Sequence, residues 1–562
     1  MDEDKNNTET EPVFTPPAAR RAPWRLSLAT FGVAVAGLTA CGGSNNNAAP
    51  GNSEPPAAIT VANPAGSCNA LAGTTVPAAS IGLPTRGAAI TSAALQARDV
   101  ATGTPEYCQV QGEILAANAA DPAIRFQLNL PSQWNVKALQ YGGGGFNGTL
   151  ITGLAVISNG PSDIPTPLAK GYATYGGDAG HQTPGGTFFL NDQAAANYSG
   201  ESVKRTRDTA MALLQSYYKA PPWKVYYQGG SKGGQEGLYA AQRHAGDFDG
   251  VIAYYPALRI PSLTLAWHRM WQPAYRTPGG YPNPAKQALV KAKVMEACDL
   301  LDGLADGIVS NTVGCAATFD VGALRCPEGA DTGDSCLSDA QINTFQTAAS
   351  PMEFAFPMAN GVTSIGGFPA YQGGELSTWL DAAGTGTAVA SYGFFDGIIK
   401  FYYYKDAAAI SDGFDYRDWR PRVEEMSRDF DVSNPNLDTF RQRGGKLLMV
   451  QGTTDMLAPD SLATAYYKSL SDRYAADLPT FMRYYVVPGF GHGWGDFQST
   501  WDSLSALEAW AERGAAPTNQ ITVDANAATR GRARPLCEYP AFPRYNGSGA
   551  PNLAASFNCV TP

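Results

Sequence analysis

Residues 226–234, YYQGGSKGG, restrict the fold of this chain more than any other stretch. They follow a short apolar run, precede a helix-like segment, and place Ser231 between Gly229 and Gly233 in a G-x-S-x-G pattern. A strand that turns sharply into a helix lifts a serine hydroxyl clear of a sheet, and glycines permit the close backbone approach. The pattern alone is weak, because a chain with 61 glycines contains it easily by chance. The segments around the pattern must decide whether Ser231 is a catalytic nucleophile or only a serine in a glycine-rich loop.

Strand-like and helix-like segments alternate on both sides of this turn. KALQYGGGGF, GYATYGGDAGHQ, WKVYYQGG and GVIAYYPA are short apolar runs typical of buried strands, and ESVKRTRDTAMALLQSYY has apolar residues at helical spacing. This order of strand, helix and strand predicts a parallel sheet covered by helices. The same alternation returns with GGKLLMVQGTTD, DSLATAYYKSLSDRYA and MRYYVVPGFGHGWG.

Residues 259–440 break this alternation. They contain Asp-Gly turns, four cysteines and aromatic clusters such as SYGFFDGIIKFYYYKD, without a regular order of strands and helices. A length prior alone would suggest about three to four separate units. The return of the strand pattern near residue 441 instead favours one α/β domain, formed by residues 66–258 and 441–562, with a large inserted segment between them.

A catalytic serine needs a base, because its hydroxyl is inert at neutral pH, and the base needs an orienting acid. In α/β-hydrolases the chain order is Ser, then Asp or Glu, then His. Of the four histidines, only His492 lies after both Ser231 and the insertion, in a loop directly after a strand. For the others a hydrogen-bonded or half-buried structural role is the simpler interpretation: His181, His244 and His268.

The acid is expected at the end of the strand between the turn and the histidine. Asp455 in QGTTDMLAP has this position. Asp460, its nearest rival, precedes SLATAYY and has the pattern of a helix N-cap. We therefore predict Asp455 as the acid.

An acyl-transfer intermediate also needs backbone N–H groups directed at its oxyanion. One is expected from Lys232, the residue after the nucleophile. The other is expected from the glycine-rich stretch GGGGFNG, residues 142–148, where Gly144 and Gly145 are both candidates. Without the other residues, a glycine-rich turn that binds nothing would be the better interpretation.

The first 41 residues indicate export. Arg20, Arg21 and Arg25 precede an uncharged stretch that ends at Cys41 and is too short to cross a bilayer, as in a signal peptide. The ending LTAC resembles the bacterial lipobox, in which the cysteine becomes the lipid-carrying first residue of the mature protein. An ordinary secretory signal cut near LTA is the alternative.

A flexible tether is predicted for residues 42–65, which contain the polar, Pro- and Gly-containing run GGSNNNAAPGNSEPPAA. Gly42 after the cysteine resembles the sorting signal for the outer membrane. The protein is thus expected to be lipid-anchored at the outer membrane or in the periplasm, or secreted, with the lipid at Cys41 as its one membrane contact. A net charge of −10 argues against nucleic acid as a partner, because phosphate binding needs clustered Lys and Arg.

Without Cys41 the chain has eight cysteines, and an even number in an exported chain indicates disulfides. Eight cysteines allow 105 pairings. Neighbours in the sequence suggest four of them: Cys68–Cys108, Cys298–Cys315, Cys326–Cys336 and Cys537–Cys559. A zinc site is a poor alternative, because the chain has no C-x-x-C and only four histidines.

A metal loop is the second candidate site. CDLLDGLADGIVSNTVGC places Asp299, Asp302 and Asp306 in a short segment between two cysteines. Hard oxygen ligands in a tight loop suit calcium, although the spacing is not that of an EF-hand. Solvated Asp-Gly turns that bind nothing are the alternative.

Several of these segments together resemble the tannase and feruloyl esterase family, which includes mono(2-hydroxyethyl) terephthalate hydrolases. The resemblance covers most of the chain after residue 65. Its most specific segments are GGGGFNG, AAQRHAGDFDGVIAYYPA, CDLLDGLADGI, NPNLDTFRQRGGKLLMVQGTTD, VVPGFGHGWG and RPLCEYPAFPRYNGSGAPNLAASFNC. It implies an α/β-hydrolase fold with a large inserted lid, and a secreted serine esterase that acts on feruloyl, galloyl or terephthaloyl esters.

The resemblance also implies roles for single residues. Ser231, Asp455 and His492 would be nucleophile, acid and base. A structural calcium ion in the lid would be held by three carboxylates and two backbone carbonyls, those of Asp299, Asp302, Leu304, Asp306 and Ile308.

The chain departs from the family pattern at two positions. Family members usually carry cysteines, joined in a disulfide, directly before the nucleophile and directly after the histidine. Here these positions are Gly230 and Gly493, so the chain is expected to be an atypical member without the active-site disulfide. This departure puts the substrate in doubt more than the reaction. An esterase for aliphatic or polyester-oligomer substrates, and a surface binding protein on the same fold, are the alternatives.

Overall fold

The computed structural model describes residues 54–562. The predicted signal peptide, Cys41 and the first half of the predicted tether therefore lie outside the described residues. Regular structure begins earlier than residue 66, the predicted start of the core. Strand β1 (Ile59–Thr60) pairs antiparallel with β6 (Gln133–Trp134) in a separate two-stranded sheet.

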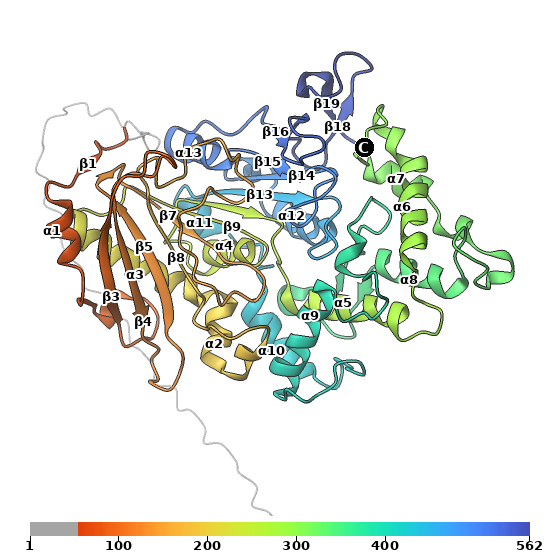
Figure 1. Cartoon of the computed structure of the whole chain (residues 1–562), viewed down its shortest axis with the longest axis horizontal. Coiled ribbons are helices and arrows are strands. Elements are labelled where there is room, and N and C mark those ends of the chain that lie inside the picture. The colour runs from red at the N-terminus through yellow and green to blue at the C-terminus, as the bar shows by residue number, and fades with distance from the viewer. Residues whose placement is uncertain (1–53) are drawn as a thin grey trace, which may run out of the picture. The chain divides into compact units, whose positions relative to one another are not determined.

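A ten-stranded sheet forms the centre of the protein (Figure 1). Six strands on one side of it are parallel, and four on the other side are antiparallel. In spatial order the strands are β14 (Met482–Val487), β13 (Lys446–Gly452), β10 (Gly250–Tyr254), β9 (Lys224–Gly230), β7 (Lys137–Tyr141), β8 (Ala173–Gly177), β5 (Ile124–Pro131), β4 (Tyr107–Ile114), β3 (Ala88–Gln96) and β2 (Thr75–Val76).

The antiparallel half corrects the prediction of a wholly parallel sheet. Strands β3, β4 and β5 follow one another through connections that contain no helix. Such short links cannot carry the chain back across a sheet, so the strands form hairpins. The α/β class is as predicted, but the sheet is mixed.

Strand β10, in the middle of the parallel half, is buried on both faces. In β10, Val251 and Ala253 pack into one apolar cluster while Ile252 and Tyr254 pack into another. Successive side chains of a strand point to opposite faces, so each cluster lies on its own side of the sheet. The helices that contact the parallel strands and β5 are α3 (Ser202–Tyr218), α4 (Lys232–Arg243), α12 (Asp460–Tyr474) and α13 (Ser503–Arg513).

The segment between β10 and β13 is mainly helical. Most of its helices lie together beside the strands, in green and teal in Figure 1, and the last one lies among the strands in that view. They are α5 (Ile260–Tyr275), α6 (Pro284–Cys298), α7 (Thr312–Thr318), α8 (Asp339–Ala349), α9 (Ala390–Ile398), α10 (Arg420–Phe430) and α11 (Asp438–Gln442), with a small hairpin of β11 (Met352–Glu353) and β12 (Ser364–Ile365).

Two further small sheets follow β14 in the chain, and two short helices lie in the amino-terminal half. The sheets are formed by β15 (Ser499–Thr500), β16 (Ile521–Asp524) and β17 (Ala533–Pro535), and by β18 (Phe542–Tyr545) and β19 (Phe557–Val560). The helices are α1 (Pro64–Asn69) and α2 (Asp192–Ala196).

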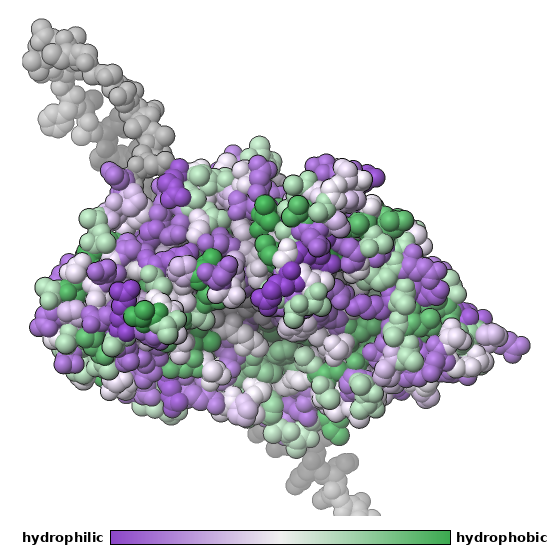
Figure 2. All heavy atoms as spheres, turned by 45° about the horizontal axis from the view of Figure 1, so that its top comes forward, coloured by the Kyte–Doolittle hydropathy of each residue, from purple (hydrophilic) through white to green (hydrophobic). Residues whose placement is uncertain are grey.

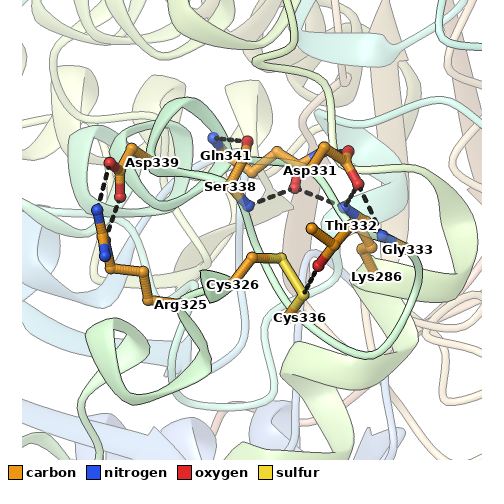
Figure 3. The surroundings of a disulfide bond; sticks show 10 residues. All are labelled: Lys286, Arg325, Cys326, Asp331, Thr332, Gly333, Cys336, Ser338, Asp339 and Gln341. Atoms are coloured by element: carbon orange, nitrogen blue, oxygen red, sulfur yellow. Dashed lines mark hydrogen bonds and ion pairs between the residues drawn. A yellow bond between two sulfur atoms is a disulfide. The ribbon is translucent and has the colours of Figure 1, made fainter. Parts of the chain in front are cut away.

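All four predicted disulfides are formed: Cys68–Cys108, Cys298–Cys315, Cys326–Cys336 and Cys537–Cys559. Figure 3 shows the Cys326–Cys336 disulfide in a loop that ion pairs also stabilise. Arg325 beside it pairs with Asp339 at 2.6 Å, and Lys286 pairs with Asp331 at 2.8 Å. Such closed loops stabilise irregular segments mainly by restricting the unfolded chain.

The surface mixes polar and apolar side chains on the face shown in Figure 2. Among residues 54–562, no helix is both long enough and apolar enough to cross a membrane.

Candidate active site

Ser231 lies in the turn between β9 and α4, as predicted. Its backbone has φ 57° and ψ −120°, and its N–H donates to the carbonyl of Tyr254 at 3.0 Å. This left-handed conformation is unfavourable for a serine, and such strain is typical of functional turns. Gly233 permits the turn, because a Cβ there would lie 2.6 Å from the carbonyl oxygen of Gly143.

Two hydrogen bonds join the three residues predicted as a triad. His492 Nε2 lies 2.7 Å from Ser231 Oγ, and His492 Nδ1 lies 2.8 Å from Asp455 Oδ2. The residues come from three different strand ends, since His492 follows β14 and Asp455 follows β13. The parallel strands bring these ends to one edge of the sheet, where ligands bind in α/β folds.

The carboxylate of Asp455 is held in a fixed orientation. Its Oδ1 accepts the backbone N–H groups of Leu457 and Ala458, both at 2.8 Å. Gln451 Nε2 donates to Oδ2 at 3.2 Å, and the side chain is fully buried. Asp460 is the first residue of α12, not its N-cap, and forms no hydrogen bond to His492.

The other three histidines have different partners. His181 stacks on Phe188 at 4.0 Å and its Nε2 lies 2.8 Å from the carbonyl oxygen of Phe146. His268 Nε2 lies 2.8 Å from Gln272 Nε2 within α5, and His244 is the C-cap residue of α4.

The glycine loop after β7 has two free backbone donors. Gly142 N–H donates to Gln228 at 2.8 Å, and Gly143 N–H donates to a carboxylate at 3.3 Å. Within the described residues, the amides of Gly144 and Gly145 have no hydrogen-bond partner. Lys232 begins α4, where the first N–H groups have no partner inside the helix. The three predicted oxyanion donors are therefore not engaged elsewhere in their loops.

Glu236 holds this glycine loop against α4, and the sequence analysis missed it. Its carboxylate accepts from Gly143 N at 3.3 Å, Asn147 Nδ2 at 2.7 Å, Tyr227 Oη at 3.0 Å and Lys232 Nζ at 3.1 Å. Burial lowers the pKa of Lys232, while Glu236 opposes this effect. A Lys and a Glu one turn apart in the glycine-rich helix KGGQEGLYAA were the available signal.

A largely apolar pocket adjoins Ser231 and His492. Phe146 of the glycine loop packs edge-on against Phe394 at 5.2 Å, and Phe394 stacks on Trp267 at 5.5 Å. Aromatic side chains from the glycine loop after β7 and from the segment between β10 and β13 therefore line the pocket. The remaining lining residues are Gly145, Tyr198, Lys232, Ala257, Ile260, Ile398, Leu457 and Ala458.

A further carboxyl group, also missed from the sequence, lies close to the histidine loop. The backbone N–H of Glu375 donates to Thr454 at 3.2 Å, and a Cβ on Gly491 would lie 3.2 Å from the Glu375 carboxyl carbon. Burial, followed by the charges of Asp455 and Asp496, raises the pKa of Glu375 to about 7. Lys291 and His492 oppose this shift.

This raised pKa predicts a pH-dependent stability. Between the ordinary pKa of a glutamate and about 7, the folded protein keeps a proton on Glu375 that the unfolded chain releases. The contribution of Glu375 to stability is therefore present at low pH and lost as pH rises to about 7. We expect Glu375→Gln to raise Tm, relative to the native protein, by roughly 1–3 °C more at pH 8 than at pH 5. Thermal unfolding of both proteins at pH 5 and pH 8 measures the effect. A Tm difference between variant and native protein that is equal at the two pH values would contradict the prediction.

The predicted calcium ligands lie in one loop but are engaged with other groups. Asp299 accepts the backbone N–H groups of residues 306–308, and Asp306 pairs with Arg534. Asp302 is 2% exposed. In the part of the chain that the structure describes, no three His, Cys, Asp or Glu side chains are arranged to hold a metal ion.

The comparisons with known proteins agree with this fold. The family model of tannase and feruloyl esterase matches residues 108–560. An uncharacterized esterase of Agrobacterium fabrum is 36% identical over 89% of this chain and 94% of its own. The mono(2-hydroxyethyl) terephthalate hydrolase of Piscinibacter sakaiensis is 30% identical over 82% and 86%.

A solved structure, feruloyl esterase B from Aspergillus oryzae, has a similar fold. Its TM-score is 0.72 at 21% identity, and it covers 88% of this chain and 100% of its own. Fold and relatives define a carboxylic ester hydrolase. The chain belongs to the tannase and feruloyl esterase family.

The expectation of an atypical member without the active-site disulfide is not borne out by these findings, which place the chain in the family with four disulfides formed. Positions 230 and 493 are glycines, and both lie against the side chain of Tyr255.

Proposed function

We propose that this protein is an exported serine esterase that hydrolyses esters of aromatic acids through an acyl-enzyme. One observation carries the proposal: Ser231, His492 and Asp455 form a continuous hydrogen-bonded chain at the end of an aromatic pocket. The family membership supports the same reaction class.

The geometry supports a two-step mechanism. Ser231 Oγ attacks the ester carbonyl while His492 Nε2 takes its proton, and Asp455 holds the Nδ1–H of the imidazole. The imidazolium then gives the proton to the leaving alcohol. A water molecule, deprotonated by His492, hydrolyses the acyl-enzyme and frees Ser231.

The free amides of the glycine loop would stabilise the oxyanion in both steps. Gly144 and Gly145 have the unengaged N–H groups, and Lys232 follows the nucleophile as the third candidate donor. Glu236 supports this role because it ties the loop to α4.

The pocket favours an uncharged aromatic acyl group. Phe146, Phe394 and Trp267 offer ring faces and edges to a flat acid. The one lysine or arginine in the lining is Lys232, whose ammonium is already paired with Glu236 at 3.1 Å. A terephthaloyl group would bring a buried carboxylate without a free cation to meet it. Feruloyl or galloyl esters therefore fit the pocket better.

A substrate panel tests this proposal. The protein, starting after Cys41, is assayed with methyl ferulate, methyl gallate, mono(2-hydroxyethyl) terephthalate and p-nitrophenyl butyrate. We expect the highest kcat/KM on a neutral aromatic ester. Turnover of the butyrate alone would indicate that the substrate is an aliphatic or polyester-oligomer ester and not an aromatic one. No turnover of any ester would favour a binding protein.

We propose that residues 259–440 act as the lid of an α/β-hydrolase fold. Trp267 and Phe394 support this, because they come from that segment and line the pocket beside Ser231.

A structural calcium ion in the loop of residues 299–308 is also proposed. The donor set suits calcium: three carboxylates within eight residues, one of them almost fully buried, and backbone carbonyls beside them. Calcium would compete with Arg534 for Asp306. We expect elemental analysis to find calcium bound to the purified protein, and EGTA to lower Tm by roughly 5 °C or more. Asp302→Asn should abolish this response, and a Tm that EGTA leaves unchanged would contradict the site.

Export and the lipid at Cys41 remain proposals. The four disulfides support an oxidising compartment. Fractionation of cells that express the full chain tests the anchor. The native protein should be found in the membrane fraction, and the Cys41→Ser variant should be absent from that fraction.

A further inference from the structure

Tyr255 follows β10 at a point where the backbone is strained. Its φ angle is 33°, which is unusual for a bulky residue, and its N–H donates to Val450 of β13 at 2.7 Å. On either side of it the chain bonds to the nucleophile. The carbonyl of Tyr254 accepts the N–H of Ser231 at 3.0 Å, and Ala257 N–H donates to the carbonyl of Ser231 at 3.2 Å. This segment is thus fixed to both neighbouring parts of the site.

The phenol of Tyr255 occupies the space between two glycines of the site. A Cβ on Gly230, directly before the nucleophile, would lie 2.7 Å from Tyr255 Oη. A Cβ on Gly493, directly after the histidine, would lie 3.1 Å from the same oxygen. The two loops therefore meet at this side chain, and neither position can carry a larger residue unless the ring moves.

The ring also contacts the base itself. Its centroid lies 4.8 Å from that of His492 and 5.7 Å from that of Phe490, and its hydroxyl donates to Asn159 Oδ1 at 3.1 Å. Burial and the nearby charge of Asp455 raise the pKa of Tyr255, so the hydroxyl stays protonated and remains a donor.

We propose that Tyr255 is a positioning residue for His492. The strained backbone and the bond to Asn159 fix the ring, and the ring fixes the imidazole at the distance at which it meets Ser231. This inference rests on the proposed triad. It assigns to one aromatic side chain the task of joining the nucleophile turn to the histidine loop, since no covalent link connects residues 230 and 493.

The test compares Tyr255→Ala with Tyr255→Phe, which keeps the ring. Tyr467→Ala is the matched control, because this half-buried tyrosine packs against Tyr484 and Tyr539 away from the site. We expect Tyr255→Ala to lower kcat roughly 10- to 100-fold with little change in KM, since a small misplacement of a catalytic group costs about this much. The acid limb of the pH profile of kcat/KM should shift, because it reports the base of the free enzyme. Tyr255→Phe should retain most activity.

A covalent replacement gives the second readout. In the Tyr255→Ala background, Gly230→Cys and Gly493→Cys direct two sulfur atoms into the space that the ring leaves, although the φ of 95° at Gly493 strains its new side chain. We expect a disulfide between them. Oxidation should then restore much of the lost kcat, and mild reduction should remove it again, while the Tyr255→Ala protein responds to neither treatment.

Two results would overturn the proposal: a Tyr255→Ala protein with native kcat and pH profile, or equal losses in Tyr255→Ala and Tyr467→Ala with equal decreases in Tm. A Ser231→Ala protein that keeps more than about 1% of native kcat would instead refute the triad.

Discussion

Replacing Ser231 with alanine is expected to lower kcat by a factor of about 10⁴ to 10⁶ on any ester that the native protein hydrolyses. The substitution removes the oxygen that lies 2.7 Å from His492 Nε2, so no acyl-enzyme can form. The oxyanion donors and the pocket remain, which is why some rate enhancement over water should persist. Initial rates at high enzyme concentration measure the residual activity.

The matched control is Ser216→Ala, since Ser216 is an exposed serine of α3. It should keep native kcat. Both variants should keep the native Tm within error, because neither removes a core contact. A Ser231→Ala protein with more than about 1% of native kcat would exclude serine catalysis, because a missing nucleophile cannot be so mild.

The three residues of the proposed triad could be selected from the sequence because the chain offers few choices. Only His492 follows both Ser231 and the insertion, and only Asp455 ends the intervening strand without heading a helix. The order of the parallel strands then brings the three side chains together. The disulfides followed from proximity in the sequence for a similar reason, since each pair closes a loop of at most 40 residues.

The sheet was only partly predictable. The βα alternation identified the parallel strands, because each needs a crossover helix. It gave no account of β3, β4 and β5, although apolar and polar residues alternate along β4 and β5 as in antiparallel strands. A local pattern reports burial on each face, whereas strand direction depends on what the connections allow.

Glu236, Glu375 and Tyr255 escaped prediction because their roles arise from contacts between distant segments. Glu236 acts on a loop 89 residues away through Asn147, and Glu375 approaches the site from the inserted segment. Tyr255 read as part of a buried strand, and nothing in GVIAYYPA reports which side chain fills the space beside Gly493. Such roles follow only from the folded chain.

Asp455→Asn is expected to lower kcat by about 10⁴ with KM nearly unchanged. The asparagine oxygen can still accept the N–H groups of Leu457 and Ala458, so the loop should keep its shape. Its amide nitrogen would then face His492 Nδ1, where an acceptor is required. The imidazole would respond by carrying its proton on Nε2, the tautomer that cannot take the proton of Ser231.

Asp460→Asn separates this effect from the loss of any carboxylate in the region. Asp460 lies five residues on, begins α12, and forms no hydrogen bond to the imidazole. We expect Asp460→Asn to keep kcat within about threefold of native, since it touches neither His492 nor the pocket. Equal losses of kcat in both variants would mean that the negative charge of the loop matters, and not the hydrogen bond between Asp455 and His492. A loss in Asp460→Asn alone would transfer the role of the acid to Asp460. Asp455 and Asp460 follow the same strand, so both carboxylates place a negative charge near the site. Comparing the two variants therefore shows whether kcat depends on the hydrogen bond that orients the His492 imidazole or only on that charge.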